Sequence, residues 1–319
     1  MIIVRDGRTG AELFRFEPAD GVGWSPVLSA DGSRLLLRAM GDAVPTLGVF
    51  DTRTGHLVNW VRTPGDVSFP PLIDAQAKRL YILGLTDTRT PPEPSPISIA
   101  AYDLDTGAEA GRVTLPDVLT GMRIVERKGQ QTQSELTPGV ALSPDGRRIA
   151  VVSAEADTVT LIDAQRMVVE CSFSFARSGG LSGRLPFLPH EAEAKGFGEG
   201  TAKQAVFAPD GRHLYIFGYQ GLYTAAGDLA DHGLGLAVVD VTTGKLVAQA
   251  FRDQWIDQVM PAPDGHSVYV SGLKQAGDIT HWSGEASTFQ FRRLDPNSLH
   301  VLATREFAGE PRFLVQPAR

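Results

Sequence analysis

Short segments of alternating apolar and polar residues recur along the chain, and two kinds of turn separate them. The first turn is Asp-Gly, as in Val140-Ala-Leu-Ser-Pro-Asp-Gly146-Arg-Arg-Ile-Ala-Val-Val, with further copies at Gly32, Gly211 and Gly265 and a degraded copy over 72–82. Asp-Gly between alternating hydrophobic residues predicts a β-hairpin, because glycine accepts the positive φ that such turns need. No helical periodicity of useful length competes with this pattern, so the sequence predicts an all-β fold.

The second turn is Asp-x-x-Thr-Gly, whose Asp and Thr side chains can bond the turn backbone while Gly takes the left-handed conformation. Its copies begin at Asp6, Asp51, Asp103 and Asp240, with looser versions at Asp163 and Asp295. The spacings between successive Asp residues are 45, 52, 60, 77 and 55. Because the two turns alternate, each cycle supplies four antiparallel strands, a to d, which is the content of one β-propeller blade.

Counting the cycles predicts a single β-propeller domain over 1–319, most simply with six blades. Five blades are expected at about 24–62, 69–115, 138–173, 203–251 and 256–306. A sixth would combine a C-terminal strand at 312–316 with the N-terminal hairpin within 1–16, which closes the ring and removes the free edges. The closing blade lacks an obvious second strand, so either it has three strands or the chain is an excerpt of a longer protein. Seven blades are the alternative count.

Two phrases carry a resemblance to known repeat families. Ser143-Pro-Asp-Gly-Arg-Arg-Ile-Ala-Val-Val and Val159-Thr-Leu-Ile-Asp-Ala resemble YVTN-type repeats, and they are similar to those of quinoprotein amine dehydrogenase-like and WD-repeat propellers. The resemblance implies a propeller fold over nearly the whole chain. Proteins of that superfamily include lactonases, dehydrogenase subunits and non-enzymatic binding proteins, so it does not select a function.

The lengths of the connections distinguish the two faces of the predicted disc. The short a–b and c–d turns emerge on one side, here called the short-turn face. The long segments are all b–c or d–a connections and emerge on the other side, here called the long-loop face: 85–96, 116–137, 174–202, 219–234 and 273–288. Loops much longer than the usual 4–6 residues are commonly functional. The sequence therefore predicts that the long-loop face, around the mouth of the central channel, binds a protein or a small-molecule ligand.

Candidate ligand-binding side chains fall in these long segments. Two of the loops share a phrase, Ala-Gly-Asp followed within four residues by His, and the residues singled out are His190, His232, His281, Asp228, Asp231, Asp278, Trp282, Arg123 and Arg127. Histidine with aspartate suits a divalent metal where three ligands meet, or a general acid–base pair in a lactonase-like site. Duplicated turn phrases explain the same pattern without chemistry. We expect Trp282 to be exposed, and Arg123 and Arg127 either to hold an acidic ligand or to be solvated.

Composition and net charge argue against several classes of protein. The net charge of −7, from 30 basic and 37 acidic residues, argues against a nucleic-acid binder. No apolar run approaches the ~20 residues of a membrane span, and single Cys171 excludes an intramolecular disulfide. No signal peptide is visible, which fits a cytoplasmic protein or an excerpt of an exported one.

Two functional hypotheses remain after these exclusions. The first is a non-enzymatic binding scaffold without a cofactor. The alternative is an enzyme or enzyme subunit, such as a lactonase-like hydrolase or a dehydrogenase-associated propeller, with a His/Asp site that could hold a divalent metal. No Gly-x-Ser-x-Gly elbow supports a serine hydrolase.

Overall fold

The computed structural model consists of β-strands joined by turns. It describes residues 2–5, 9, 11–16, 27–29, 32–39, 46–62, 71–74, 76, 78–85, 94–127, 130–175, 202–223, 229–252, 254–276, 278–279 and 288–308. The N-terminal hairpin within this part of the chain consists of β1 (Ile2–Arg5) and β2 (Glu12–Phe16). The predicted strand at 312–316 lies outside the described residues, so the six-blade count stays a prediction.

Five antiparallel four-stranded units follow the hairpin. Blade 1 comprises β3 (Val27–Leu28), β4 (Arg34–Ala39), β5 (Thr46–Asp51) and β6 (Leu57–Arg62). Blade 2 comprises β7 (Leu72–Asp74), β8 (Arg79–Leu85), β9 (Ser95–Asp103) and β10 (Glu109–Arg127). Blade 3 comprises β12 (Gly139–Leu142), β13 (Arg148–Val152), β14 (Thr158–Asp163) and β15 (Val168–Ser174).

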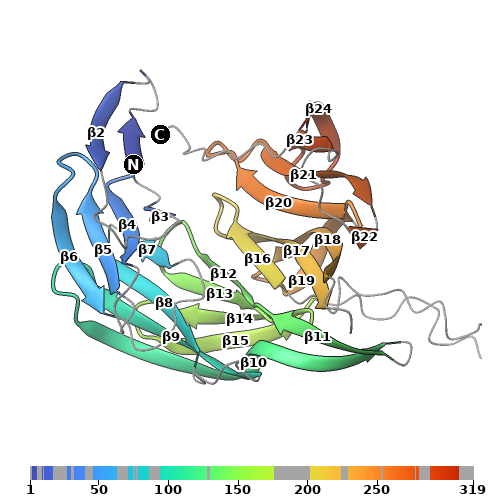
Figure 1. The fold of residues 1–319 in the computed structure, drawn as a ribbon, viewed down its shortest axis with the longest axis horizontal. Helices are drawn as coiled ribbons and strands as arrows, with labels where there is room; N and C mark the ends of the chain where they lie inside the picture. Colours follow the sequence, from blue (N-terminus) through green and yellow to red (C-terminus); the bar gives the residue numbers. More distant parts are fainter. Residues whose placement is uncertain are drawn as a thin grey trace, which may run out of the picture.

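Blades 4 and 5 complete the series. Blade 4 comprises β16 (Ala202–Phe207), β17 (His213–Tyr223), β18 (Leu229–Asp240) and β19 (Lys245–Ala250). Blade 5 comprises β20 (Gln254–Pro261), β21 (Val268–Ala276), β23 (Thr288–Leu294) and β24 (Val301–Ala308). Figure 1 shows the five blades following one another around a common centre, with β12, β16 and β20 on the inside and β6 and β15 at the periphery. The predicted all-β propeller fold is confirmed.

Apolar side chains fill the space between consecutive blades. One such cluster joins blades 2 and 3 through Leu83, Ile99, Ile149 and Val151, all fully buried, and equivalent clusters join blades 1 and 2, 3 and 4, and 4 and 5. Burying each of these side chains contributes about 1.5–3 kcal/mol relative to leaving it exposed. Blade-to-blade packing therefore holds consecutive blades together around the centre.

The two repeated turns form as the sequence predicts. Asp51 Oδ1 accepts hydrogen bonds from the backbone N–H groups of Arg53 (2.9 Å) and Thr54 (3.1 Å), and Gly55 has a φ of 71°. In the looser copies Met167 and Leu299 occupy the glycine position with positive φ. Both side chains are buried in the blade-to-blade clusters, which offsets the cost of a left-handed backbone.

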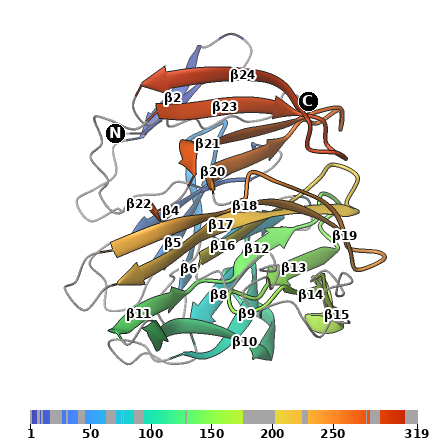
Figure 2. The same ribbon diagram turned by 90° about the vertical axis from the view of Figure 1, so that its right-hand side faces the viewer.

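Three segments predicted as loops form strands in almost all of the residues that the structure describes. Segment 116–137 forms the second half of β10 together with β11 (Gln130–Leu136), and 219–234 and 273–288 contribute the ends of β17 and β21, the start of β18, and β22 (Asp278–Ile279). Strand pairing satisfies the backbone polar groups of these long segments. In Figure 2 the ends of β10, β11, β17 and β18 project to the same side of the disc. Most of the predicted loops 85–96 and 174–202 lie outside the described residues.

Candidate functional site

The strands that project on the long-loop face pair with one another. The order β10, β11, β17, β18, β22 forms one continuous series of antiparallel pairs, here called the accessory sheet. Residues Gln133 and Ser134 of β11 pair with Tyr223 and Leu222 of β17. Because β11 follows blade 2 whereas β17 belongs to blade 4, this pairing connects two blades that are not neighbours in the ring.

The accessory sheet also brings together two of the predicted site residues. His232 of β18 lies opposite Asp278 of β22, and Asp231 lies opposite Ile279. His190, Asp228, His281 and Trp282 lie outside the described residues. Within the described part of the chain, no group of three or more His, Cys, Asp or Glu side chains could hold a metal ion.

Arg123 forms an internal contact of the long-loop face. Its guanidinium Nη1 donates to Glu155 Oε1, and the two side chains are 35% and 28% exposed. Glu155 belongs to the connection between β13 and β14 of blade 3, so this ion pair attaches the β10–β11 hairpin to that blade. Arg123 thus forms a bond within the protein and stays partly exposed, and its role in holding an acidic ligand remains a prediction. Arg127 lies opposite Gln130, where β10 and β11 are joined.

A buried ion pair lies nearby on the same face. Lys203 Nζ donates to the backbone oxygen of Ala156 (2.9 Å) and lies 3.4 Å from Asp157 Oδ1, with side-chain exposures of 0% for the lysine and 7% for the aspartate. Burial lowers the pKa of Lys203, and the Asp157 carboxylate opposes that shift. Since Lys203 is the second residue of β16 and Asp157 precedes β14, the pair joins blades 3 and 4 rather than serving an open site.

Aromatic and cation–π contacts join blades 4 and 5. The rings of Tyr219 and Trp255 stack with centroids 4.3 Å apart, and the guanidinium of Arg292 lies 4.6 Å from the centre of the Phe251 ring. Arg292 also donates to Gln254 Oε1 at 3.0 Å. Trp255 of β20 therefore packs against Tyr219 of the neighbouring blade.

A cavity of about 570 Å³ lies at the other end of the channel. The first strands of all five blades line it together with a–b turn residues of blades 2 to 5, so it opens on the short-turn face. Most of its lining is apolar, including the half-buried Val27, Leu28, Leu72, Val140, Leu142 and Val206. This volume lies within the 300–1,000 Å³ range of small-molecule sites, which are likewise mostly apolar.

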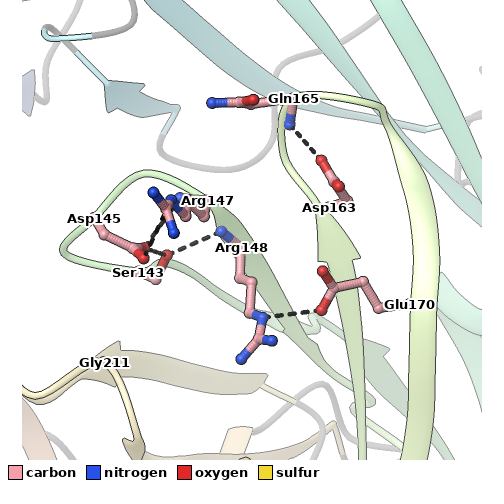
Figure 3. A pocket seen from close by; sticks show the side chains of 8 residues that line it. All are labelled: Ser143, Asp145, Arg147, Arg148, Asp163, Gln165, Glu170 and Gly211. Carbon is pink, nitrogen blue, oxygen red and sulfur yellow. Dashed lines mark hydrogen bonds and ion pairs between the residues drawn. The ribbon is translucent and has the colours of Figure 1, made fainter.

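A smaller charged cleft of about 300 Å³ adjoins this cavity at Ser143 and Asp145. Figure 3 shows that its charged groups are engaged with one another: Arg148 Nε lies 2.9 Å from Glu170 Oε2, and Ser143 Oγ donates to Asp145 Oδ1 at 2.6 Å. Asp163 Oδ1 accepts from the backbone N–H of Gln165 at 2.9 Å. The Ser143 and Asp163 contacts cap two turns of blade 3, and the Arg148–Glu170 pair joins β13 to β15, so these groups are engaged within the protein.

Sequence reasoning did not identify the residues that line the cavity, although a signal for them exists. The lining residues occupy equivalent repeat positions, immediately before and within each a–b turn, as at Leu142 in blade 3 and Phe207 in blade 4. Comparing the repeats position by position would have grouped them. Which of them face the channel depends on strand register, which the sequence does not fix.

Comparisons with known proteins give the fold. Neither protein-family models nor curated protein sequences match the chain. The β-propeller domain of Cps50 (Swd1) from Myceliophteria thermophila is similar in structure, with 14% identity, a TM-score of 0.55, and coverage of 91% of this chain and 73% of that one. Quinohemoprotein alcohol dehydrogenase from Comamonas testosteroni has 12% identity, a TM-score of 0.52, and coverage of 96% and 57%.

A third similar structure is hydrazine synthase from Kuenenia stuttgartiensis, with 15% identity and a TM-score of 0.49. The match covers 86% of this chain but 66% of that one, slightly less than two thirds of its length. At such identities the likeness is one of fold alone. Within the described residues, no helix has the length and apolar character needed to cross a membrane.

Proposed function

We propose that the chain is a non-enzymatic propeller scaffold that binds a protein partner through its long-loop face. The observation that carries this proposal is the accessory sheet. The connections of blades 2, 4 and 5 pair as strands there and create a structured surface on one side of the disc. A rigid scaffold that presents such an elaborated surface is well suited to recognition.

The free edge of the accessory sheet supports a protein partner in particular. Over Gly121–Arg127, β10 pairs with β11 and with no other strand of the described chain. Alternate residues of such an edge direct unpaired N–H and C=O groups outward, and an extended segment of another protein can bond to them. Ile124 in this edge is 68% exposed, the largest exposure among the large hydrophobic side chains of the described residues.

The test compares two exposed apolar side chains on different edges. Ile124→Asp places a charge on the proposed edge, and Leu302→Asp, at a side chain that is 47% exposed on β24, is the matched control. Partners are identified by chemical cross-linking and mass spectrometry, and binding of each purified partner is then measured directly. We expect Ile124→Asp to weaken binding at least about tenfold and Leu302→Asp to leave it unchanged. Equal binding by both variants would contradict the proposal.

A His/Asp site at the channel mouth is the second candidate function. It is supported by the register of β18 and β22, which makes His232 and Asp278 cross-strand partners. The test is elemental analysis of protein purified without chelators, with the His232→Ala/His281→Ala double variant as control. One metal per chain that is lost in the double variant would favour an enzyme. A metal-free protein that is inert toward a broad substrate panel would remove this candidate.

A further inference from the structure

The cavity at the short-turn end of the channel has a distinctive charge pattern. Among the described residues that line it, the charged side chains are Asp74 and Asp145, and no lysine or arginine is present. Asp74 ends β7 of blade 2 and Asp145 belongs to the a–b turn of the neighbouring blade 3, so both lie on the same part of the rim. The cavity thus combines an apolar interior with two carboxylates at one side of its mouth.

The two carboxylates are held in place by their own turns. Asp74 Oδ1 accepts from the backbone N–H of Gln76 at 3.0 Å, and Asp145 Oδ1 accepts from Ser143 Oγ and from the backbone N–H of Arg147. Burial raises the pKa of Asp145, but these hydrogen bonds outweigh it, so its pKa lies below the ordinary value and the group is ionised at neutral pH. Arg147 is a weak competitor, because its Nε lies 3.9 Å from Asp145 Oδ2 and the side chains of Arg147 and Asp145 are 78% and 59% exposed.

We propose that this cavity binds a small organic cation with an apolar body and one ammonium group. The apolar body occupies the space between the first strands, where Leu72, Leu142 and Val206 exchange contact with water for contact with the ligand. The ammonium group lies at the rim beside Asp74 and Asp145, where hydrogen bonds to a charged acceptor are stronger than those between neutral groups. This site is independent of the partner proposed for the opposite face.

Three probes with one apolar body separate the contributions of charge and of burial. They are 4-phenylbutylammonium, 4-phenylbutanol and 4-phenylbutanoate, titrated into the full chain by calorimetry at neutral pH. We expect the ammonium to bind about tenfold or more tightly than the alcohol, and the carboxylate to bind least. Equal binding of ammonium and alcohol would overturn the charge selection, and no binding by any probe at millimolar concentration would overturn the site.

Substitutions test whether Asp74 and Asp145 cause the preference for the ammonium probe. Asp74→Asn/Asp145→Asn should remove the preference for the ammonium while leaving alcohol binding unchanged. Asp264→Asn is the matched control, because Asp264 occupies the same turn position in blade 5, accepts from the N–H of His266 at 2.9 Å, and does not line the cavity. Thermal melting establishes that each variant is folded, and Val206→Phe, which fills the cavity, should weaken all three probes. A preference for the ammonium that survives the double variant would contradict the proposal.

Discussion

The two faces of the propeller are stabilised in different ways. On the short-turn face, each c–d turn begins with an aspartate that accepts bonds from residues two and three positions ahead, as Asp103 does from Asp105 (3.0 Å) and Thr106 (2.8 Å). The backbone N–H and the hydroxyl of Thr106 hold the pKa of Asp103 below its ordinary value. On the long-loop face, the contacts join different blades, as in Lys203–Asp157 and Arg123–Glu155.

This difference separates local from long-range stabilisation. The bonds that cap a short turn lie within five consecutive residues, although some side chains add longer-range contacts on this face, as Arg79 Nη1 does by donating to the backbone oxygen of Gln165 in the next blade (3.0 Å). A contact on the long-loop face fixes one blade against another, and burial makes the loss of one partner more costly. Substitutions on the long-loop face should therefore destabilise the protein more than matched substitutions on the short-turn face.

The largest effect is expected at the buried pair. Asp157→Ala leaves the fully buried Lys203 without its carboxylate and should lower the free energy of unfolding by about 3–5 kcal/mol. Urea denaturation at neutral pH measures this loss. The Asp157→Ala/Lys203→Met double variant should be less destabilised than Asp157→Ala alone, because it removes the unpaired charge. A loss below about 1 kcal/mol in the single variant would show that the pair is not stabilising.

The pH dependence sharpens the same prediction. Burial lowers the pKa of folded Lys203 below the ordinary lysine value of 10.5, so the unfolded chain binds more protons between these two values. The contribution of Lys203 to the free energy of unfolding therefore rises with pH in that window. Asp157→Ala removes the group that opposes the shift, so its destabilisation relative to the wild type should shrink as the pH is raised toward 10.5. If the difference in free energy of unfolding between Asp157→Ala and the wild type did not change with pH, the prediction that folded Lys203 is charged would be contradicted.

An intermediate effect is expected at the c–d turn of blade 4. Asp240 accepts from Arg212 Nε (2.9 Å) and from the backbone N–H of Thr242 (2.8 Å), and the Arg212 guanidinium holds the pKa of Asp240 well below its ordinary value. Asp240→Ala should cost about 1.5–3 kcal/mol at neutral pH, measured by urea denaturation.

Measurements at acidic pH distinguish the loss of the Asp240 hydrogen bonds from a general packing defect. The stabilisation from the lowered pKa of Asp240 is complete above the unfolded aspartate pKa of about 3.9 and is lost as the pH falls toward the folded pKa. The penalty for Asp240→Ala should therefore be smaller at pH values below about 4 than at neutral pH. An equal loss of stability at acidic and at neutral pH would show that the Asp240→Ala penalty comes from packing.

The comparison also explains what could be predicted from the sequence. The short turns were predicted because Asp51 and Thr54, or Asp103 and Thr106, act within one five-residue segment. The accessory sheet was missed because Gln133 and Tyr223, which pair across it, are about 90 residues apart. The alternation of apolar and polar residues identifies a strand but not the distant strand with which it pairs. Strand register then decides which side chains reach the channel. The carboxylates of Asp74 and Asp145 appeared in the sequence only as turn residues.

The smallest effect is expected at an exposed ion pair of the short-turn face. Lys78 Nζ lies 2.5 Å from Asp105 Oδ2, but the two side chains are 60% and 45% exposed, so water and salt screen the attraction. Lys78→Met should change the free energy of unfolding by less than about 1 kcal/mol, and 1 M salt should reduce the difference further. Lys78 has a φ of 53°, a strain that methionine shares, so the substitution isolates the ion pair. A double-mutant cycle with Asp105→Asn measures the coupling, and a value as large as that at Lys203–Asp157 would remove the distinction between the two faces.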